Sequence, residues 1–226
     1  MSPQKTGGEG QSEPAEMYLE TIYRLAENEG IARTTALAKS LGVSPGAVTN
    51  TLASLEAQGL VRRRAYKGVE LTPKGRAVAL RVLRRHRLAE QLLTKVLRMK
   101  WSDVHETACK LEHAMNGELT NAVERLLEHP KTCPHGNPIP DETGRIRMEN
   151  SQPLSDFQPK DKAVLVRITE ERSDMLRYLA SLGLMPGAVL EIQEKAPFDG
   201  PMIVKVMGAS YALGRNVASV VEARRI

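Results

Sequence analysis

Apolar residues recur at helical spacing over residues 16–29 and predict a first helix that ends before Gly30. A short helix is expected at about 35–41. After a tight turn, a third helix is predicted at about 45–58, with Ser44 as its N-cap and a proline as its first residue. Two short strands then fit residues 60–72, joined by a basic turn. This order of elements predicts a winged helix-turn-helix.

The following stretch is helical again and then loses its periodicity. A long helix is predicted from a Thr72–Gly75 cap to about Leu97, followed by helices at about 101–116 and 118–127. The proline-rich residues 130–160 are interpreted as an extended linker rather than a packed element.

The end of the chain is rich in short β patterns. A helix is expected near 175–182, and glycines mark tight turns between the strands. Four strands are expected, at 163–168, 189–192, 202–206 and 217–221. A small barrel is the arrangement that fits them.

The whole pattern predicts a mainly α protein with a small β part. We expect a disordered tail at 1–14, a winged-helix DNA-binding domain at 15–76, a helical domain at 77–140, a linker at 141–158 and a β domain at 159–226.

Composition indicates where such a protein works. No stretch approaches the roughly 20 apolar residues that cross a bilayer, and the first residues lack the apolar core of a signal peptide, so we expect a soluble cytoplasmic protein without a membrane partner. Its two cysteines, Cys109 and Cys133, are expected to be reduced thiols. The net charge of +5 is uneven, because residues 61–100 are strongly basic and residues 101–130 are acidic. That asymmetry indicates a face for a polyanion beside a site for cations.

The predicted third helix has the small and polar residues that a recognition helix needs at its N-terminal turn. Thr49 and Asn50 are the candidates for contacts with base edges, and Ser44 and Thr35 suit phosphates. Gly46 and Ala47 allow close approach to the groove, and the basic residues Arg62 to Arg64 and Lys67 suit the flanking backbone. The alternative is a helical hairpin that packs against protein, with its charges only solvated.

Metal-ligand side chains lie on two neighbouring predicted helices. Four of them fall within roughly a 100° arc of one helix; they are His105, Cys109, Glu112 and His113. His86 and Glu90 form a further i, i+4 pair. Imidazole, thiolate and carboxylate together favour a first-row transition metal over calcium or magnesium. Alternatively, Glu90 or Glu112 pairs with nearby arginines.

Three other residues are assigned no metal role from the pattern. Met17 by itself is interpreted as a core methionine. Cys133 and His135 lie in a Cys-Pro-His-Gly-Asn-Pro loop and receive no metal role.

Over about Glu16 to Pro140 the chain resembles the diphtheria toxin repressor family of iron-dependent regulators. The resemblance rests on four segments: Glu16-Met17-Tyr18-Leu19-Glu20-Thr21-Ile22-Tyr23, His86-Arg87-Leu88-Ala89-Glu90, His105-Glu106-Thr107-Ala108-Cys109-Lys110-Leu111-Glu112-His113 and Gly136-Asn137-Pro138-Ile139-Pro140.

The resemblance implies a homodimer with two metal sites in each chain. Met17, Cys109, Glu112 and His113 would form the primary, activating site, and this assigns Met17 as a ligand. His86, Glu90 and His105 would form an ancillary site. Thioether and thiolate donors suit the iron branch of the family, since its manganese branch has carboxylates there. Fe²⁺ is therefore the expected cofactor, with Mn²⁺, Co²⁺, Ni²⁺ or Zn²⁺ as possible substitutes.

The family's last domain is an SH3-like barrel, similar to ferrous-transport accessory domains, and it fits the β-rich end of this chain. In longer iron regulators this barrel lends a Glu and a Gln to the ancillary site. The matching stretch Arg172-Ser173-Asp174-Met175 lacks both, so the expected barrel ligands are missing. Glu170, Glu171 and Asp174 are the available substitutes, and none is assigned.

The expected function is that of a metal-dependent repressor. Metal would activate the homodimer for a palindromic double-stranded DNA operator and so control iron and metal homeostasis genes. The alternatives are a manganese-responsive regulator of the same family, a metal-independent winged-helix regulator and a metalloenzyme. The sequence shows no nucleophile elbow or phosphate-binding loop, so no catalytic residues and no enzymatic activity are expected.

Overall fold

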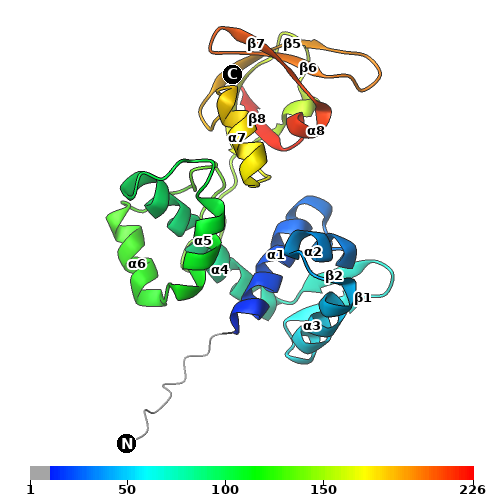
Figure 1. Cartoon of the computed structure of the whole chain (residues 1–226), viewed down its shortest axis with the longest axis vertical. Coiled ribbons are helices and arrows are strands. Elements are labelled where there is room, and N and C mark those ends of the chain that lie inside the picture. The colour runs from blue at the N-terminus through cyan, green and yellow to red at the C-terminus, as the bar shows by residue number, and fades with distance from the viewer. Residues whose placement is uncertain (1–10) are drawn as a thin grey trace, which may run out of the picture. The chain divides into compact units, whose positions relative to one another are not determined.

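The computed structural model describes residues 11–226, and the chain divides between Leu83 and Arg84 into two compact units (Figure 1). The first ten residues of the predicted tail lie outside the described residues. Helix α1 (Glu13–Glu29) begins before the predicted start, with Pro14 in its first turn, and ends at Gly30. None of the helices in residues 11–226 is both long and apolar enough to cross a bilayer.

The first unit has the predicted winged helix-turn-helix order. Helix α2 (Thr34–Leu41) and helix α3 (Pro45–Ala57) are joined by a turn in which Gly42 adopts φ +65°. The N–H of Gly42 donates to the Ala38 carbonyl and ends α2. Ser44 is the predicted N-cap of α3, because its Oγ accepts a 3.2 Å hydrogen bond from the Ala47 N–H.

The wing is the two-stranded sheet of β1 (Val61–Arg64) and β2 (Gly68–Leu71), paired antiparallel with Val61 opposite Leu71. Gly68 has φ +136°, and a Cβ there would lie 2.4 Å from the Ala32 carbonyl oxygen. This close approach lets Ala32 form a β-bridge to Val69, which ties the wing to the segment before α2.

Helix α4 (Pro73–Gln91) runs through the boundary between the units and continues into a π-helical turn (Leu92–Val96). The second unit then has helix α5 (His105–Leu111), a 3₁₀ turn (Glu112–Ala114) and helix α6 (Gly117–Leu126). The prediction of one helix over 101–116 is therefore wrong at both ends.

The helical part of the second unit has its own apolar core. Its buried members come from α4, the π-helical turn, α5, α6 and the proline-rich segment. They are Leu88, Ala89, Leu93, Val104, Ala108, Met115, Val123, Leu127 and Ile139.

The β-rich end is a six-stranded antiparallel sheet in the order β3-β8-β4-β5-β6-β7. Its strands are β3 (Gln152–Pro153), β4 (Lys162–Ile168), β5 (Val189–Lys195), β6 (Met202–Val206), β7 (Ala209–Leu213) and β8 (Val221–Arg225). Register shifts in the pairing of β4 with β8 and of β5 with β6 bend the sheet around a buried apolar core, in agreement with the expected SH3-like domain.

Two short helices complete this domain: α7 (Ser173–Ser181) and α8 (Arg215–Ala218). The expected strand at 217–221 is wrong, because α8 occupies its first half and β8 begins only at Val221. The sequence pattern missed β7, which pairs with β6 along its whole length.

The proline-rich segment is packed at both ends, where residues 135–140, Leu154 and Phe157 are buried, and this corrects its interpretation as an extended linker throughout; residues 141–150 are mostly exposed. Leu154 and Phe157 are fully buried in the barrel core. Around Gly136 the chain lies along the end of β4, where the Ile168 N–H donates a 2.9 Å hydrogen bond to the His135 carbonyl. Prolines remove backbone donors, but they do not prevent a segment from packing when its other groups find partners.

Candidate DNA interface and metal centre

The exposed face of α3 carries the residues predicted to read DNA. Val48, Leu52 and Leu55 supply its buried face, so the opposite side of the helix remains in solvent. Every predicted contact residue is exposed, namely Thr35, Ser44, Gly46, Ala47, Thr49 and Asn50. An exposed N-terminal turn of small residues is the part of a recognition helix that can enter a major groove.

Local hydrogen bonds set what these side chains can offer to DNA. Thr49 Oγ1 donates a 3.0 Å hydrogen bond to the Pro45 carbonyl, so its oxygen remains an acceptor. The Oγ of Ser44 accepts from a backbone N–H, and its own hydrogen remains available for a phosphate oxygen. The amide of Asn50 carries a donor and an acceptor, the pair that matches adenine.

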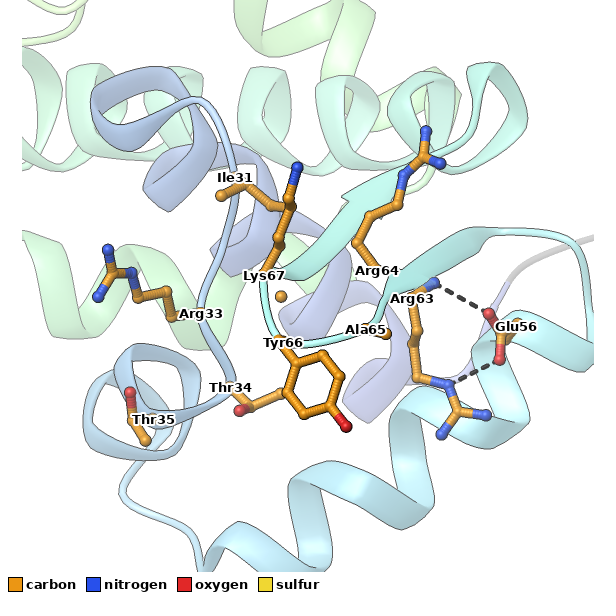
Figure 2. A pocket seen from close by; sticks show the side chains of 11 residues that line it. Ile31, Arg33, Thr34, Thr35, Glu56, Arg63, Arg64, Ala65, Tyr66 and Lys67 are labelled. Atoms are coloured by element: carbon orange, nitrogen blue, oxygen red, sulfur yellow. Dashed lines mark hydrogen bonds and ion pairs between the residues drawn. The ribbon is translucent and has the colours of Figure 1, made fainter.

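An open hollow of about 910 Å³ lies between the start of α2 and the wing (Figure 2). Figure 2 shows Arg33, Thr34 and Thr35 on one side of it, and Tyr66 and Lys67 from the turn between β1 and β2 on the other. The N-terminus of α2, hydroxyl groups and cationic side chains share this rim. These are the groups that position a DNA phosphate.

Two of the wing arginines predicted to face DNA are engaged in exposed ion pairs. Arg63 donates to both oxygens of Glu56, through its backbone N at 2.9 Å and its Nε at 2.6 Å. The backbone hydrogen bond, followed by the side-chain one, lowers the pKa of Glu56. Arg64 Nε lies 3.0 Å from Glu70. Exposed pairs contribute little to stability, so a phosphate can replace either carboxylate at small cost.

In the second unit, His86 is the centre of a buried cluster. Its Nδ1 lies 2.6 Å from Glu112 Oε2. Its Nε2 lies 3.1 Å from both Glu90 Oε1 and His105 Nδ1. The predicted i, i+4 pair of His86 and Glu90 therefore points inward, and both imidazole nitrogens face candidate ligands.

Opposite charges stabilise this buried pair. Burial disfavours the charged form of each group, but their mutual attraction outweighs it. The pKa of His86 is raised and the pKa of Glu90 is lowered as a result. These contacts do not support the alternative in which Glu90 pairs with an arginine, since its Oε1 contacts the imidazoles of His86, His105 and His135.

Cys109 lies on α5 against two of the imidazoles. Its Sγ is 3.8 Å from His105 Nε2 and 3.9 Å from His86 Nδ1. Burial alone raises the pKa of the thiol, but hydrogen bonding to the two histidines outweighs it and lowers that pKa to about 6. Burial lowers the pKa of His105, but its contacts with Cys109 and Glu90 and the charge of Glu171 together outweigh burial and raise that pKa to about 9. A thiolate at neutral pH is the form of cysteine that binds metal.

The remaining predicted ligands are Met17 and His113. His113 Nε2 lies 3.2 Å from Glu112 Oε1, on the 3₁₀ turn that follows α5. Met17 lies on α1 in the first unit, with 41% of its surface exposed. Its interpretation from the pattern alone, as a core methionine, is wrong.

The barrel brings one carboxylate to the cluster, and it belongs to one of the three substitutes that the sequence offers. Glu171 lies between β4 and α7 and is buried, with Oε2 3.5 Å from His105 Nδ1. The other two substitutes, Glu170 and Asp174, instead contact Arg172. Only the tertiary structure shows that Glu171, and not Glu170 or Asp174, faces the cluster.

Cys133 and His135, to which the sequence pattern assigns no metal role, also face this cluster. His135 Nδ1 lies 3.3 Å from Glu90 Oε1, and Cys133 Sγ lies 3.9 Å from both His135 Nδ1 and Glu171 Oε1. A Cys-x-His spacing in a Pro- and Gly-containing loop was the available signal. It is too short a pattern to interpret without knowing what the loop packs against.

These residues fit a divalent transition metal. Among the described residues, four overlapping groups of His, Cys and carboxylate atoms have members within 4.8 Å of one another, and three of the groups lie wholly in the second unit. In addition, Glu90 Oε2 is buried without a hydrogen-bond partner among the described residues. A buried carboxylate oxygen costs free energy unless something binds it, and a cation is the partner that mixed nitrogen, sulfur and oxygen donors favour.

A recognition helix with a basic wing, together with buried imidazole, thiolate and carboxylate groups, defines a DNA-binding regulator with a metal centre. Three known domain families match consecutive parts of the chain. Residues 11–69 match the N-terminal DNA binding domain of iron dependent repressors, residues 72–141 their metal binding and dimerisation domain, and residues 152–225 a FeoA domain.

Similar proteins agree with this assignment. The iron-dependent repressor IdeR of Mycobacterium tuberculosis is 34% identical over 93% of this chain and 96% of its own length. The diphtheria toxin repressor of Corynebacterium diphtheriae is 33% identical over 91% and 94%. A solved manganese-dependent transcriptional repressor in complex with manganese has a TM-score of 0.87 and 32% identity, over 94% of this chain and 100% of that one.

The chain belongs to the diphtheria toxin repressor family and is a metal-dependent transcriptional repressor. The matched domains indicate DNA, a divalent metal ion and a second copy of the chain as its partners.

Proposed function

We propose that ferrous iron activates this repressor and that the activated homodimer binds a palindromic operator controlling iron homeostasis genes. The observation that supports iron is the donor set. Burial raises the pKa of the Cys109 thiol, but its contacts with two histidines outweigh burial and lower that pKa to about 6. The neighbouring carboxylate and imidazole come from Glu112 and His113. We assign Met17 as the fourth donor of this primary site and His86, Glu90, His105 and Glu171 to the ancillary one. Soft sulfur donors favour iron over manganese.

The chain's own residues connect metal to DNA. Met17 belongs to the helix that opens the DNA-binding unit, whereas Cys109, Glu112 and His113 belong to the helical part of the other unit. A bound divalent ion supplies the positive charge and directed bonds that hold such donors at one point. When one ion binds donors from both units, it restricts the movement of one unit against the other. This restriction favours one distance between the two recognition helices of the dimer.

The free energy needed for this switch is within reach of such a site. A shift from 1% to 99% of the DNA-competent arrangement requires a differential binding free energy of about 5.5 kcal/mol. Structural metal sites with thiolate and imidazole donors supply about 10–16 kcal/mol in total, so a difference of this size is available.

On the DNA side, we propose that α3 reads the major groove through Thr49 and Asn50, with Gly46 and Ala47 allowing close approach. Ser44 and Thr35 then bind phosphates, and the hollow beside the wing receives the sugar-phosphate backbone. The observation that supports this is the exposure of all six residues on one unit with a basic rim. We place this activity in the cytoplasm and assign the protein no enzymatic role, since the relatives described above are repressors.

A manganese-responsive regulator is the second candidate, because the structural similarity includes a repressor in complex with manganese. The deciding experiment is operator binding by the metal-free protein under anaerobic conditions, titrated separately with Fe(II), Mn(II) and Zn(II). We expect Fe(II) to stimulate binding at lower concentration than Mn(II). Equal affinity with and without a chelator would contradict metal activation altogether.

Two substitutions test which residues form the primary metal site. Cys109→Ala and His113→Ala should abolish stimulation by Fe(II) while the dimer stays folded, because each removes one donor. His129→Ala is the matched control, since His129 is exposed and belongs to none of these groups. Full stimulation in either donor variant would disprove the primary-site assignment.

A further inference from the structure

The tip of the wing carries an aromatic side chain that the rest of the described chain leaves uncovered. The turn between β1 and β2 consists of Ala65, Tyr66 and Lys67, and Tyr66 is fully exposed. Figure 2 shows its ring projecting from the turn beside the hollow. We propose that this ring enters the minor groove of the operator and distinguishes A·T from G·C pairs beside the site that α3 reads. The inference rests on the proposed function and adds a second reading element to it.

The turn holds Tyr66 in an unfavourable backbone conformation. The Lys67 N–H donates a 3.0 Å hydrogen bond to the Arg64 carbonyl, which closes a β-turn with Ala65 and Tyr66 at its centre. Tyr66, the third residue of this turn, has φ +60°. Glycine or asparagine normally takes such a position, because a Cβ there lies too close to the following carbonyl oxygen. A residue that contradicts its local conformation in this way is most often found at a functional site.

Strain and exposure alone do not identify a DNA contact. Phe198, in the turn between β5 and β6, is also fully exposed and has φ +57°. The surroundings distinguish the two residues. Tyr66 lines the hollow together with Arg33, Thr35 and Lys67, whereas Phe198 belongs to the β-rich end of the chain. An aromatic ring beside cations and hydroxyl groups is a combination that nucleic acid can bind.

The position of the hollow decides which groove Tyr66 faces. With α3 in the major groove, the hollow receives a sugar-phosphate backbone, as proposed above. Each backbone of a duplex separates the major groove from the minor groove. The wing turn lies across the hollow from the start of α2, so its tip lies beyond this backbone and reaches the minor groove (Figure 2). That groove is about 6 Å wide, which admits the edge of a flat ring but not a helix.

The base of the wing is anchored, so the tip has a defined place relative to the helix-turn-helix. Ala32 and Val69 exchange two backbone hydrogen bonds, of 3.2 and 2.9 Å. The side chains of Val61 on β1 and Val69 on β2 are buried and fix one face of each strand. A tip that is held in place before binding loses less conformational freedom when it enters a groove.

A tyrosine side chain matches the minor-groove surface of an A·T pair. The groove floor offers only acceptors at A·T, whereas guanine adds an amino group that projects into the groove. The phenolic hydroxyl can donate to such an acceptor, and within residues 11–226 it has no hydrogen-bond partner. The guanine amino group would occupy the space that the ring needs. The pair at the wing should therefore be A·T, whatever sequence α3 reads.

The test uses the full-length chain with the metal that activates it, Fe(II) or Mn(II), and the operator that the wild type selects from random DNA. Three duplexes differ only in the pairs that flank the recognised site, which are A·T, G·C or inosine·C. Inosine·C keeps the major-groove groups of G·C and lacks the minor-groove amino group. We expect the wild type to bind the G·C duplex about fivefold or more weakly than the A·T duplex. The inosine·C duplex should bind about as tightly as the A·T one.

Three variants separate the ring from the turn. Tyr66→Gly removes the ring and tolerates the positive φ, so it should bind the three duplexes equally and keep its stimulation by metal. Tyr66→Phe keeps the ring and should still disfavour the G·C duplex. Phe198→Gly is the matched control, because it makes the same kind of change in an exposed turn with a similar φ, and it should behave as the wild type does.

Hydroxyl-radical footprinting supplies a direct readout, since the radicals attack deoxyribose hydrogens that line the minor groove. The wild type should protect the flanking sugars, and Tyr66→Gly should leave them open to attack. Equal wild-type affinity for the three duplexes, or an unchanged preference in Tyr66→Gly, would overturn the proposal. Failure of the proposed function is distinguishable, because metal activation compares one duplex with and without metal, whereas the flank preference compares duplexes at one metal concentration.

Discussion

Asn137 donates a 2.8 Å hydrogen bond from its amide nitrogen to Oε1 of Glu171, although 34 residues separate the two in the chain. The bond joins the proline-rich loop to the segment between β4 and α7. It thereby orients the carboxylate that the barrel contributes to the metal cluster.

Asn137→Asp should weaken metal binding at this cluster by roughly 10–100-fold, because the donor is lost and a like charge faces Glu171. Anaerobic Co(II) titration of a Cys109→Ser chain, in which Cys133 is the only thiol, measures the effect. Asn150→Asp makes the same change at an exposed position and serves as the control. Equal affinities for the two variants would show that Asn137 does not position Glu171.

Gly136→Ala should destabilise the packing of the proline-rich loop on the barrel. A Cβ at Gly136 would lie 2.1 Å from the Val166 carbonyl oxygen, and the residue has φ +86°. Overpacking and left-handed strain together predict a loss of about 2–5 kcal/mol of unfolding free energy. Gly187→Ala is the control, since φ there is +89° but nothing lies within 4 Å. It should cost only about 1–2 kcal/mol in the same denaturant titration.

Asn50→Ala and Lys67→Ala should affect operator binding in different ways. Loss of a base contact at Asn50 should cost about 1–3 kcal/mol and relax discrimination at one base pair. Loss of the cation at Lys67 should weaken binding to all sequences and reduce the slope of log affinity against log salt by about 1. Binding measured at several salt concentrations, on the operator and on scrambled DNA, separates them. If the Asn50→Ala variant discriminates between base pairs as well as the wild type does, Asn50 does not contact a base.

Glu222→Gln should weaken the junction of β4 and β8, where Arg167 donates to both oxygens of Glu222, at 2.7 and 2.9 Å. Burial raises the pKa of Glu222, but the hydrogen bonds from Arg167 and Ser151 outweigh it and lower that pKa below 4.5. A lowered carboxyl pKa stabilises the fold above the pKa of the unfolded chain, and this contribution is lost as the pH falls through the folded value.

The measurement for this junction is hydrogen exchange of the β4 and β8 amides. At pH 7 the substitution should cost roughly 1.5–3 kcal/mol of local stability, the range for hydrogen bonds to a charged group. The difference between variant and wild type should shrink as the pH falls below the ordinary pKa of a glutamate, about 4.3. A constant difference across that range would mean that the charge of Glu222 is not what stabilises the junction.

Local sequence was sufficient for the winged helix. The cap at Ser44, the tight turn before it and the helix that follows are determined by residues a few positions apart, so spacing predicted them. The same holds for His86 and Glu90, which are one helical turn apart on α4. Where local preference was ambiguous, prediction failed, as at 217–221, where α8 replaces the first half of an expected strand.

The sequence by itself thus determined the recognition helix, the basic wing and the helical metal ligands, because helical periodicity fixes which side chains share a face. Tertiary structure alone decided that Cys133, His135 and Glu171 join them. These three side chains reach the cluster through long-range contacts, between the proline-rich loop and β4 and between Asn137 and Glu171. No periodicity reports such contacts, since they arise only when the barrel packs against the loop that precedes it.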